Sequence, residues 1–433
     1  MDEDEDGPYF PPEPIERGPP PDGTRLVIDP DVGELLLAAR DFQPGELVVR
    51  EEVLLLAPPE LPPMSMFKPV PDNVGVVQME GEGFPYSVTF NRLHFNLLFE
   101  FISEDRTVQA ESLRMQSDMI PGSECVRSIE QVAQYIWEQN LPWLRGMERD
   151  VIFKLLRLFR VNSFPCKSGG RDRCCLLKWG TMLNTTCRPN CHYMSAEVDG
   201  KYEGRFYSLR SIREGEILGS SYAPHTSLIG SLAQRRRVFW NLKGFICQCP
   251  WCREEEAEGD EARPLTCICS EERETQLCSE VMCLVMQKPL WERLEMINPL
   301  RDRTSELPAD HWASRSIQCI LLLAEGRNLQ KRRGPKNESG ALFTDETCGW
   351  LRKVWEVECW VRARRPGLYV LTAFQLAPLV QDLRVGVDVT EDWMRDILAW
   401  AQAETGIDEA AAQATVDTTV ALCYVRPPEL DEE

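Results

Sequence analysis

Phe245-Ile246-Cys247-Gln248-Cys249-Pro250-Trp251-Cys252 is the stretch of sequence that decides the fold. Its thiols have the spacing C-x-C-x-x-C, which places three ligands of a tetrahedral zinc site in one short segment. A fourth ligand must then come from elsewhere and would staple two distant parts of the chain together. Free cysteines that pack as small hydrophobic side chains are the alternative, but they explain this spacing poorly. We therefore predict a structural zinc site here.

The cysteines are unevenly distributed along the 433 residues. Of the 17 cysteines, 13 fall between Cys125 and Cys283, and none precedes Cys125. Clustered CxC and CxxC spacings without a signal peptide favour metal binding in an intracellular protein of the nucleus or the cytoplasm, rather than a secreted disulfide framework. A further group with irregular spacing could form a second zinc site or consist of free thiols: Cys267, Cys269, Cys278 and Cys283.

Composition and charge narrow the class of partners. The net charge of −21 argues against direct nucleic-acid binding, which needs a basic face. An acidic surface attracts lysine-rich protein segments, although the same charge can simply serve solubility. No apolar run is long enough to span a membrane. The length suits two or three domains.

The expected strands and helices do not alternate regularly. Strands are predicted at Glu34–Ala39 and Leu47–Ala57, and apolar stripes at helical spacing predict helices around residues 129–136, 152–159 and 350–361. Because regular βαβ alternation is missing, we predict an α+β fold rather than a doubly wound sheet.

Four short motifs precede the cysteine segment. They are Gly33–Phe42 followed by Pro44-Gly45-Glu46, then Val161-Asn162-Ser163-Phe164, then Asn184-Thr185-Thr186-Cys187-Arg188-Pro189-Asn190, and then Gly215-Glu216-Ile217-Leu218-Gly219-Ser220-Ser221-Tyr222. In this order the five motifs resemble the SET-domain lysine methyltransferases, and most closely the SMYD branch, over about residues 25–255. Residues 58–124 contain no cysteine, so the MYND zinc finger of that branch has no counterpart. The chain is therefore similar to the MYND-less SMYD-type SET proteins of arthropods.

The resemblance implies a SET β-core with a helical insert, a post-SET zinc segment and a helical C-terminal region. The expected segments are a disordered acidic and Pro-rich tail at 1–23, the N-terminal part of SET at 24–90, the helical insert at 91–160, the C-terminal part of SET at 161–223, the zinc segment at 224–255 and the helical C-terminal region at 256–433.

The resemblance also implies the functional residues. Cys187 would complete the zinc site with Cys247, Cys249 and Cys252. S-adenosylmethionine would lie in a pocket lined by Gly33, Asn162, Asn184, Thr185 and Phe245. Tyr222 would be catalytic, because its hydroxyl can orient a lysine amine and stabilise the polarised methyl group. A turn glycine, a core phenylalanine and a buried tyrosine are the plainer interpretations of Gly33, Phe245 and Tyr222.

Two departures from the family bear on activity. Thr185 stands where the family has histidine, and Glu34 stands where it usually has arginine. If each change costs about 1.4 kcal/mol, each weakens cofactor binding about tenfold. Two functions therefore remain open. One is an S-adenosylmethionine-dependent methyltransferase for histone or other protein lysines. The other is a catalytically weakened scaffold that binds protein partners through its C-terminal helices, in transcriptional regulation for example.

Overall fold

The structure is a computed structural model, and not all of its residues can be described. The described residues are 18–30, 33–58, 68–69, 76–79, 88–115, 119–138, 140–144, 146–168, 171–223, 228, 232–258, 276–277, 280–281, 283–285, 290–305, 307, 311–333, 344–364, 369–374 and 376–383, with a few isolated positions besides. Most of the predicted N-terminal tail lies outside these ranges. So do Cys267, Cys269 and Cys278 of the predicted second zinc site.

Small β-sheets form the core. The strands are β1 (Thr24–Asp29), β2 (Gly33–Ala38), β3 (Leu47–Glu52), β4 (Leu55–Leu56), β8 (Phe164–Ser168), β9 (Arg171–Leu176), β10 (Asn184–Thr185), β11 (Cys191–Val198), β12 (Lys201–Ser208) and β13 (Gly219–Ser220). Antiparallel sheets have the orders β1-β2, β11-β12-β3 and β4-β9-β8, and β10 pairs with β13 in parallel. The strands predicted around Glu34–Ala39 and Leu47–Ala57 are thereby confirmed.

The helical insert lies between β7 (Val88–Asn91) and β8. It consists of α1 (Arg92–Ser103), α2 (Arg106–Leu113), α3 (Glu124–Glu138), the 3-10 turn η1 (Pro142–Leu144) and α4 (Arg149–Asn162), and it follows the small sheet of β5 (Lys68–Pro69), β6 (Val76–Met79) and β7. Apolar residues at helical spacing fix these elements. Ile129, Val132 and Ile136 of α3 and Leu155 and Phe159 of α4 are all buried, as the periodicity predicts.

Helices dominate the C-terminal half. The described helices are α5 (Leu232–Lys243), α6 (Pro250–Glu258), α8 (Leu290–Thr304), α9 (Trp312–Arg333), α10 (Thr344–Arg364), α11 (Val370–Ala373) and α12 (Ala377–Leu383). The stripe Trp350, Val354, Val357 and Val361 of α10 is buried. Helix α5 ends at Lys243, and Gly244 after it has a φ of 71°, the left-handed conformation expected just past a helix C-terminus.

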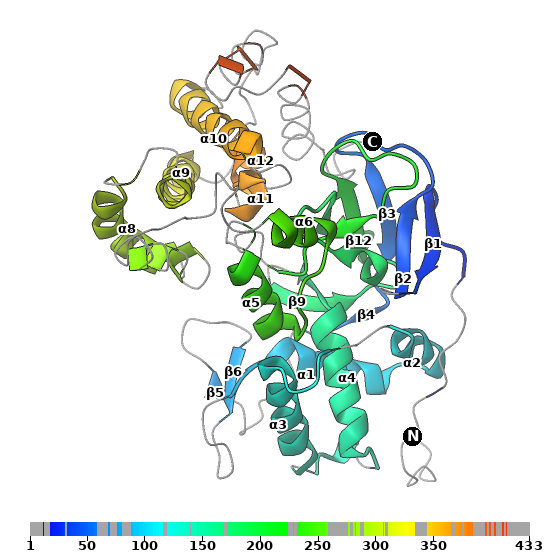
Figure 1. Ribbon diagram of the computed structural model, residues 1–433. Coiled ribbons are helices and arrows are strands. Elements are labelled where there is room, and N and C mark those ends of the chain that lie inside the picture. Colours follow the sequence, from blue (N-terminus) through cyan, green and yellow to red (C-terminus); the bar gives the residue numbers. More distant parts are fainter. Residues whose placement is uncertain are drawn as a thin grey trace.

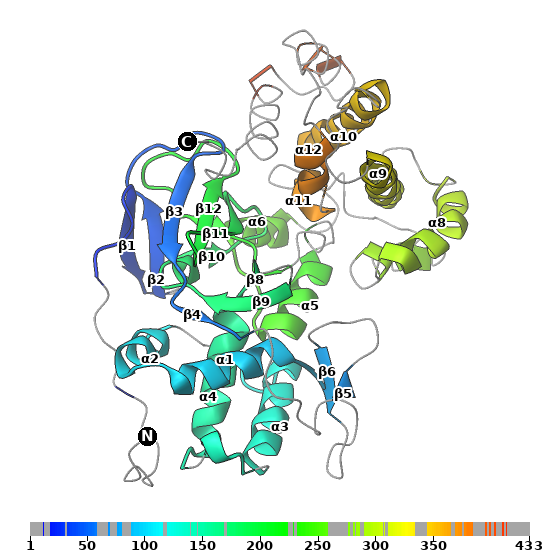
Figure 2. The same cartoon turned by 180° about the vertical axis from the view of Figure 1, so that it is seen from behind.

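Helices α5 and α6 occupy the centre of the molecule. Figures 1 and 2 show the β-sheets on one side of them, α8 to α12 on another, and α1, α3 and α4 on a third. One hydrophobic cluster joins Cys187 and Cys252 to the core of α9 and α10, and Tyr222 and Phe245 pack against its edge. The α+β fold predicted from the sequence is confirmed, and the segment carrying the thiols lies where its three parts meet.

Candidate functional site: a buried four-sulfur cluster beside Tyr222

The structure brings four thiols together from distant positions in the chain. The Sγ atoms of Cys187, Cys247, Cys249 and Cys252 all lie within 4.8 Å of one another, and all four residues are buried. Cys187 Sγ is 3.9 Å from Cys247 Sγ and 3.6 Å from Cys252 Sγ. A zinc ion bonded to four sulfurs at about 2.3 Å sets them about 3.8 Å apart. The cluster therefore has the dimensions of a closed tetrahedral site that could hold zinc.

Local structure explains how the short segment presents three thiols. Cys247 and Cys249 lie in the loop after α5, and Cys252 lies in the first turn of α6. Helix α6 begins at Pro250, a favoured first residue because proline lacks the N–H that would otherwise be unpaired. The helix N-terminus favours the thiolate form of Cys252. Hydrogen bonding with the Cys187 thiol lowers the pKa of both Cys249 and Cys252.

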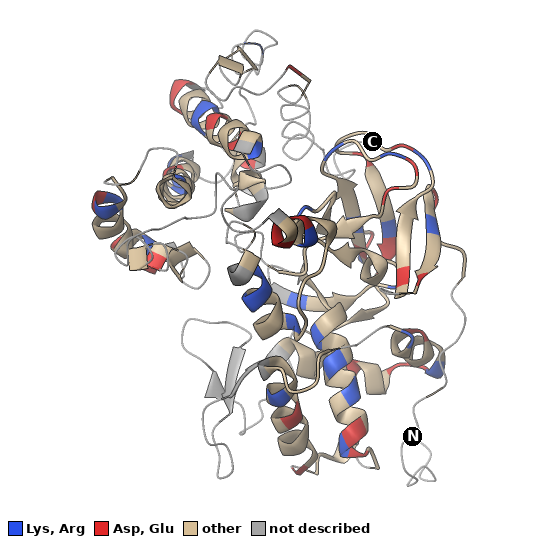
Figure 3. Ribbon diagram, in the orientation of Figure 1, with Lys and Arg blue, Asp and Glu red and all other residues tan. Residues whose placement is uncertain are grey.

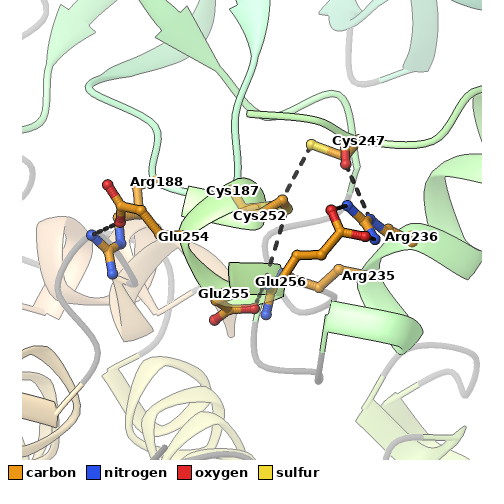
Figure 4. Close-up of polar contacts among 9 residues, drawn as sticks. All are labelled: Cys187, Arg188, Arg235, Arg236, Cys247, Cys252, Glu254, Glu255 and Glu256. Atoms are coloured by element: carbon orange, nitrogen blue, oxygen red, sulfur yellow. Dashed lines mark hydrogen bonds and ion pairs between the residues drawn. The ribbon is translucent and has the colours of Figure 1, made fainter. Parts of the chain in front are cut away.

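Basic side chains surround the cluster. Arg235 is fully buried, with Nη2 4.0 Å from Cys252 Sγ, and it forms an ion pair with Glu255. The Trp251 ring lies between two guanidinium groups, of Arg188 at 4.6 Å and Arg235 at 4.3 Å. Figure 4 shows Arg188 and Arg235 near the Cys187 and Cys252 sulfurs. Four thiolates and one Zn²⁺ carry two excess negative charges, which neighbouring guanidinium groups stabilise.

Tyr222 lies in the adjoining loop. Its backbone N–H donates to Thr185 Oγ1 at 3.1 Å, and its hydroxyl donates to the Thr181 carbonyl at 3.3 Å. Thr181 belongs to the 3-10 turn η2 (Gly180–Met182), which lies beside β2. Burial raises the pKa of Tyr222, so the phenol stays protonated at neutral pH. The hydroxyl is a neutral hydrogen-bonding group and not a phenolate base.

The short parallel pair β10–β13 carries two polar atoms that need partners. Asn184 pairs with Gly219 and Thr185 with Ser220. Asn184 Nδ2 and Ser220 Oγ are buried and have no hydrogen-bond partner among the described residues. A buried polar group without a partner costs free energy, so a polar ligand that reached this strand pair could stabilise both groups. Thr185 differs from them, because its hydroxyl already accepts from Tyr222.

Asn162 is the last residue of α4. Its Nδ2 donates to the Leu158 carbonyl at 2.9 Å. The adjacent carbonyls of Arg160 and Val161 accept hydrogen bonds from Lys243 Nζ at 2.7 and 3.2 Å, while Arg160 Nε donates to the Leu242 carbonyl at 2.7 Å. Helices α4 and α5 therefore cap each other's C-termini. This reciprocal arrangement fixes Asn162 relative to Phe245, which follows α5.

The other two predicted pocket residues, Gly33 and Phe245, belong to separate segments of the chain. Gly33 begins β2 with a φ of 89°, a conformation that favours glycine. Phe245 is half-buried and stacks on Phe239 with ring centroids 5.3 Å apart. The carboxylate of Glu34 pairs at 3.2 Å with Arg114, the C-cap residue of α2. The negative charge that Glu34 introduces is therefore balanced within the protein.

Sequence reasoning missed three residues of this site. Lys243 and Arg235 resemble ordinary helix-surface cations in the sequence. Only the packing of α5 against α4 and α6 shows that Arg235 is buried and that Lys243 is half-buried. Ser220 lies in the motif Gly215–Tyr222, two residues before Tyr222. Its position in the sequence could therefore have identified it as a candidate site residue.

Lysine and arginine are interspersed with aspartate and glutamate over many of the described helices and strands (Figure 3). No helix within the described part of the chain combines the length and the apolar character needed to cross a membrane.

Two curated proteins are similar to parts of this chain, while no family model matches it. The SET domain-containing protein SmydA-8, isoform A, of Drosophila melanogaster is 28% identical over 148 residues, which is 33% of this chain and 30% of that protein. The histone-lysine N-methyltransferase SET5 of Meyerozyma guilliermondii is 29% identical over 84 residues, 19% of this chain and 17% of that protein. The chain thus spans less than a third of the length of either relative. These similarities support a SET-domain protein, and one of the two relatives is named as a lysine methyltransferase.

Proposed function

We propose that this chain is an S-adenosylmethionine-dependent protein-lysine methyltransferase of the SMYD-like branch. The observation that carries the proposal is the Asn184 amide, buried without a partner next to the strand that leads to Tyr222. An ordinary core position would supply that amide with an acceptor. The name of one relative includes histone-lysine methyl transfer, and in this chain that substrate class is part of the proposal.

The proposed cofactor pocket has two walls. Asn184 and Thr185 form one with Gly33, and Asn162 and Phe245 form the other. The Asn184 amide would donate to the methionine carboxylate or to the adenine edge, and the Phe245 ring would pack on the adenine face. The cofactor supplies an electrophilic methyl group on a sulfonium. The unpartnered Ser220 hydroxyl offers a further polar contact near that group.

Tyr222 would act on the substrate amine by orientation. A lysine amine must be neutral to attack a methyl group, and its lone pair must point along the bond that breaks. The protonated phenol, fixed at its backbone by Thr185 and at its hydroxyl by Thr181, would hold the amine in that direction. Because the pKa of Tyr222 is raised, the tyrosine would place the amine and would not deprotonate it.

The sulfur cluster would serve structure and not chemistry. Four cysteine ligands fill all positions of a tetrahedral zinc ion, so none remains for a substrate or a water. Cys187 follows β10 by two residues, and Cys247 follows Phe245 by two residues. A zinc ion shared by Cys187 and Cys247 would therefore hold the two walls of the pocket at a fixed separation.

Titration calorimetry with S-adenosylmethionine tests the proposal. We expect saturable heat with one cofactor per chain, and weaker binding in the Asn184→Ala variant. Incubation with radiolabelled methyl donor and a panel of histones and peptides then tests transfer to lysine. An absence of binding at millimolar cofactor would contradict the enzyme and leave the partner-binding scaffold as the better account.

A further inference from the structure

Lys243 places an amine next to the candidate catalytic tyrosine. Its Nζ lies 5.8 Å from the centroid of the Tyr222 ring and is held there by the carbonyls of Arg160 and Val161. The lysine is contributed by the C-terminus of α5, and the two carbonyls by the end of α4. No mobile linker is needed to bring this amine to the site, because two helices already fix its position.

The protonation state of this amine suits an acceptor. Burial, with the nearby positive charge of Arg160, lowers the pKa of Lys243 to about 7. Much of the amine is therefore neutral at physiological pH, whereas an exposed lysine is almost fully protonated. A neutral amine has two N–H bonds and one lone pair. The two carbonyls take the two N–H bonds at 2.7 and 3.2 Å, which leaves the lone pair available.

A purely structural role does not require this residue type. A cation that caps a helix C-terminus stabilises it most when it stays charged, and lysine loses charge readily when buried. Arg160 shows the alternative, because an arginine makes the reciprocal cap to the Leu242 carbonyl. Lysine at position 243 thus supplies what arginine lacks, which is a nucleophilic nitrogen.

We propose that Lys243 is a methyl acceptor of this protein, so that the enzyme modifies its own chain within one molecule. The inference rests on the proposed function. In the transfer, the methyl–sulfur bond of S-adenosylmethionine breaks as the bond from that carbon to Nζ forms. The sulfonium becomes the neutral thioether S-adenosylhomocysteine, and Nζ becomes a methylammonium that can release its proton to solvent.

The two carbonyls that accept from Lys243 also determine how many methyl groups we expect on its Nζ. A monomethylated ammonium keeps two N–H bonds, enough for both Arg160 and Val161, whereas a dimethylated one keeps only one. A second transfer would leave a buried carbonyl without its donor, which costs free energy. We therefore expect a single methyl group on Lys243.

The experiment uses the full-length protein and S-adenosylmethionine with an isotopically labelled methyl group. Intact-mass and tandem mass spectrometry should find one labelled methyl group on Lys243, gained at a first-order rate that does not change when the protein is diluted tenfold. Lys243→Arg keeps a cation that can donate to both carbonyls and should lose this label. The matched control Lys201→Arg changes an exposed lysine of the β11–β12 hairpin and should keep it.

The outcomes separate the two proposals. Cofactor binding, or methylation of panel substrates, without label on Lys243 would overturn this inference and leave the proposed function intact. Absence of cofactor binding in calorimetry would overturn both. A labelling rate that rises in proportion to protein concentration would assign any Lys243 methylation to transfer between molecules and contradict the intramolecular step.

Discussion

Asn184 of β10 and Asn190 of the loop that follows it differ in their hydrogen bonding. Asn190 is fully used by the fold: its Oδ1 accepts from the Gly219 N–H at 2.8 Å, and its Nδ2 donates to the Ile217 carbonyl at 2.9 Å. Asn184 Nδ2 has no partner among the described residues. Substitution of Asn184 therefore tests the proposed pocket, and the same substitution of Asn190 is its control.

We predict that Asn184→Ala weakens S-adenosylmethionine binding about tenfold, which corresponds to about 1.4 kcal/mol. Its melting temperature should change little, because the protein loses no hydrogen bond from Nδ2. Asn190→Ala should instead lower the free energy of unfolding by about 2 kcal/mol, because two backbone groups lose their partners. Calorimetry and thermal unfolding measure both quantities. Equal loss of stability in the two variants would argue that Asn184 is structural.

Tyr222→Phe should slow methyl transfer roughly a hundredfold or more, because the hydroxyl that orients the amine is lost. Folding should survive, since the change removes one hydrogen bond, to the Thr181 carbonyl. Tyr193→Phe is the matched control, because that hydroxyl contacts only the Cys175 thiol among the described residues. Single-turnover rates with labelled cofactor distinguish the two. Unchanged turnover in Tyr222→Phe would remove this residue from its assigned role.

Strand β2 and helix α2 are joined by the ion pair between Glu34 and Arg114. Both side chains are largely buried, with 15% and 28% exposed, so solvent screens the pair only in part. We predict that Glu34→Arg lowers the free energy of unfolding by about 1 kcal/mol, since it sets two guanidinium groups against each other. The charge-swapped double variant Glu34→Arg/Arg114→Glu should recover most of that loss. Chemical denaturation checks this, and a double variant no more stable than the single one would refute the pairing.

The elements themselves were largely predictable, and their contacts were not. Buried stripes at helical spacing identified α3, α4 and α10, and the strands around Glu34 and Leu47 followed from alternation and turn residues. The partner of Glu34 was not visible, because Arg114 is 80 positions away along the chain and on another element. The reciprocal caps of Arg160 and Lys243 depend in the same way on how α4 meets α5.

In the candidate site, too, some residues could be predicted from the sequence, whereas their contacts could not. Spacing alone pointed to Cys247, Cys249 and Cys252 as a set, because three ligands fit within one segment. Cys187 could be added only by resemblance, and the structure places its sulfur among the others. That Asn184 has an unpartnered amide while Thr185 has an engaged hydroxyl depends on the parallel pairing of β10 with β13. No local pattern encodes that pairing.

The molecule as a whole carries a buried carboxyl that couples its stability to pH. Glu358 of α10 is fully buried, and its carboxylate accepts from the Leu371 N–H of α11 at 3.0 Å. Burial raises the pKa of Glu358 to about 7. The folded state therefore binds more protons than the unfolded state between about pH 4.3 and pH 7. Stability from this group falls as pH rises through that window and is level above it.

In the wild-type protein we expect the free energy of unfolding to fall by about 2 kcal/mol between about pH 5 and pH 7 because of Glu358. Glu358→Gln should remove most of this decrease. Glu325→Gln is a suitable control, because that carboxylate is exposed and pairs with Lys353 across α9 and α10. Urea unfolding at several pH values gives the profiles. Identical profiles for the wild-type protein and Glu358→Gln would show that Glu358 does not titrate in this range.

The metal content of the purified protein tests the central claim most directly, because the four sulfurs join the two walls of the proposed pocket. Elemental analysis should find one tightly bound zinc ion per chain. That zinc should be lost in Cys187→Ala and kept in Cys359→Ala, which changes a buried cysteine of α10. A folded wild-type protein with no bound metal, or one whose zinc survives the Cys187 substitution, would contradict the account.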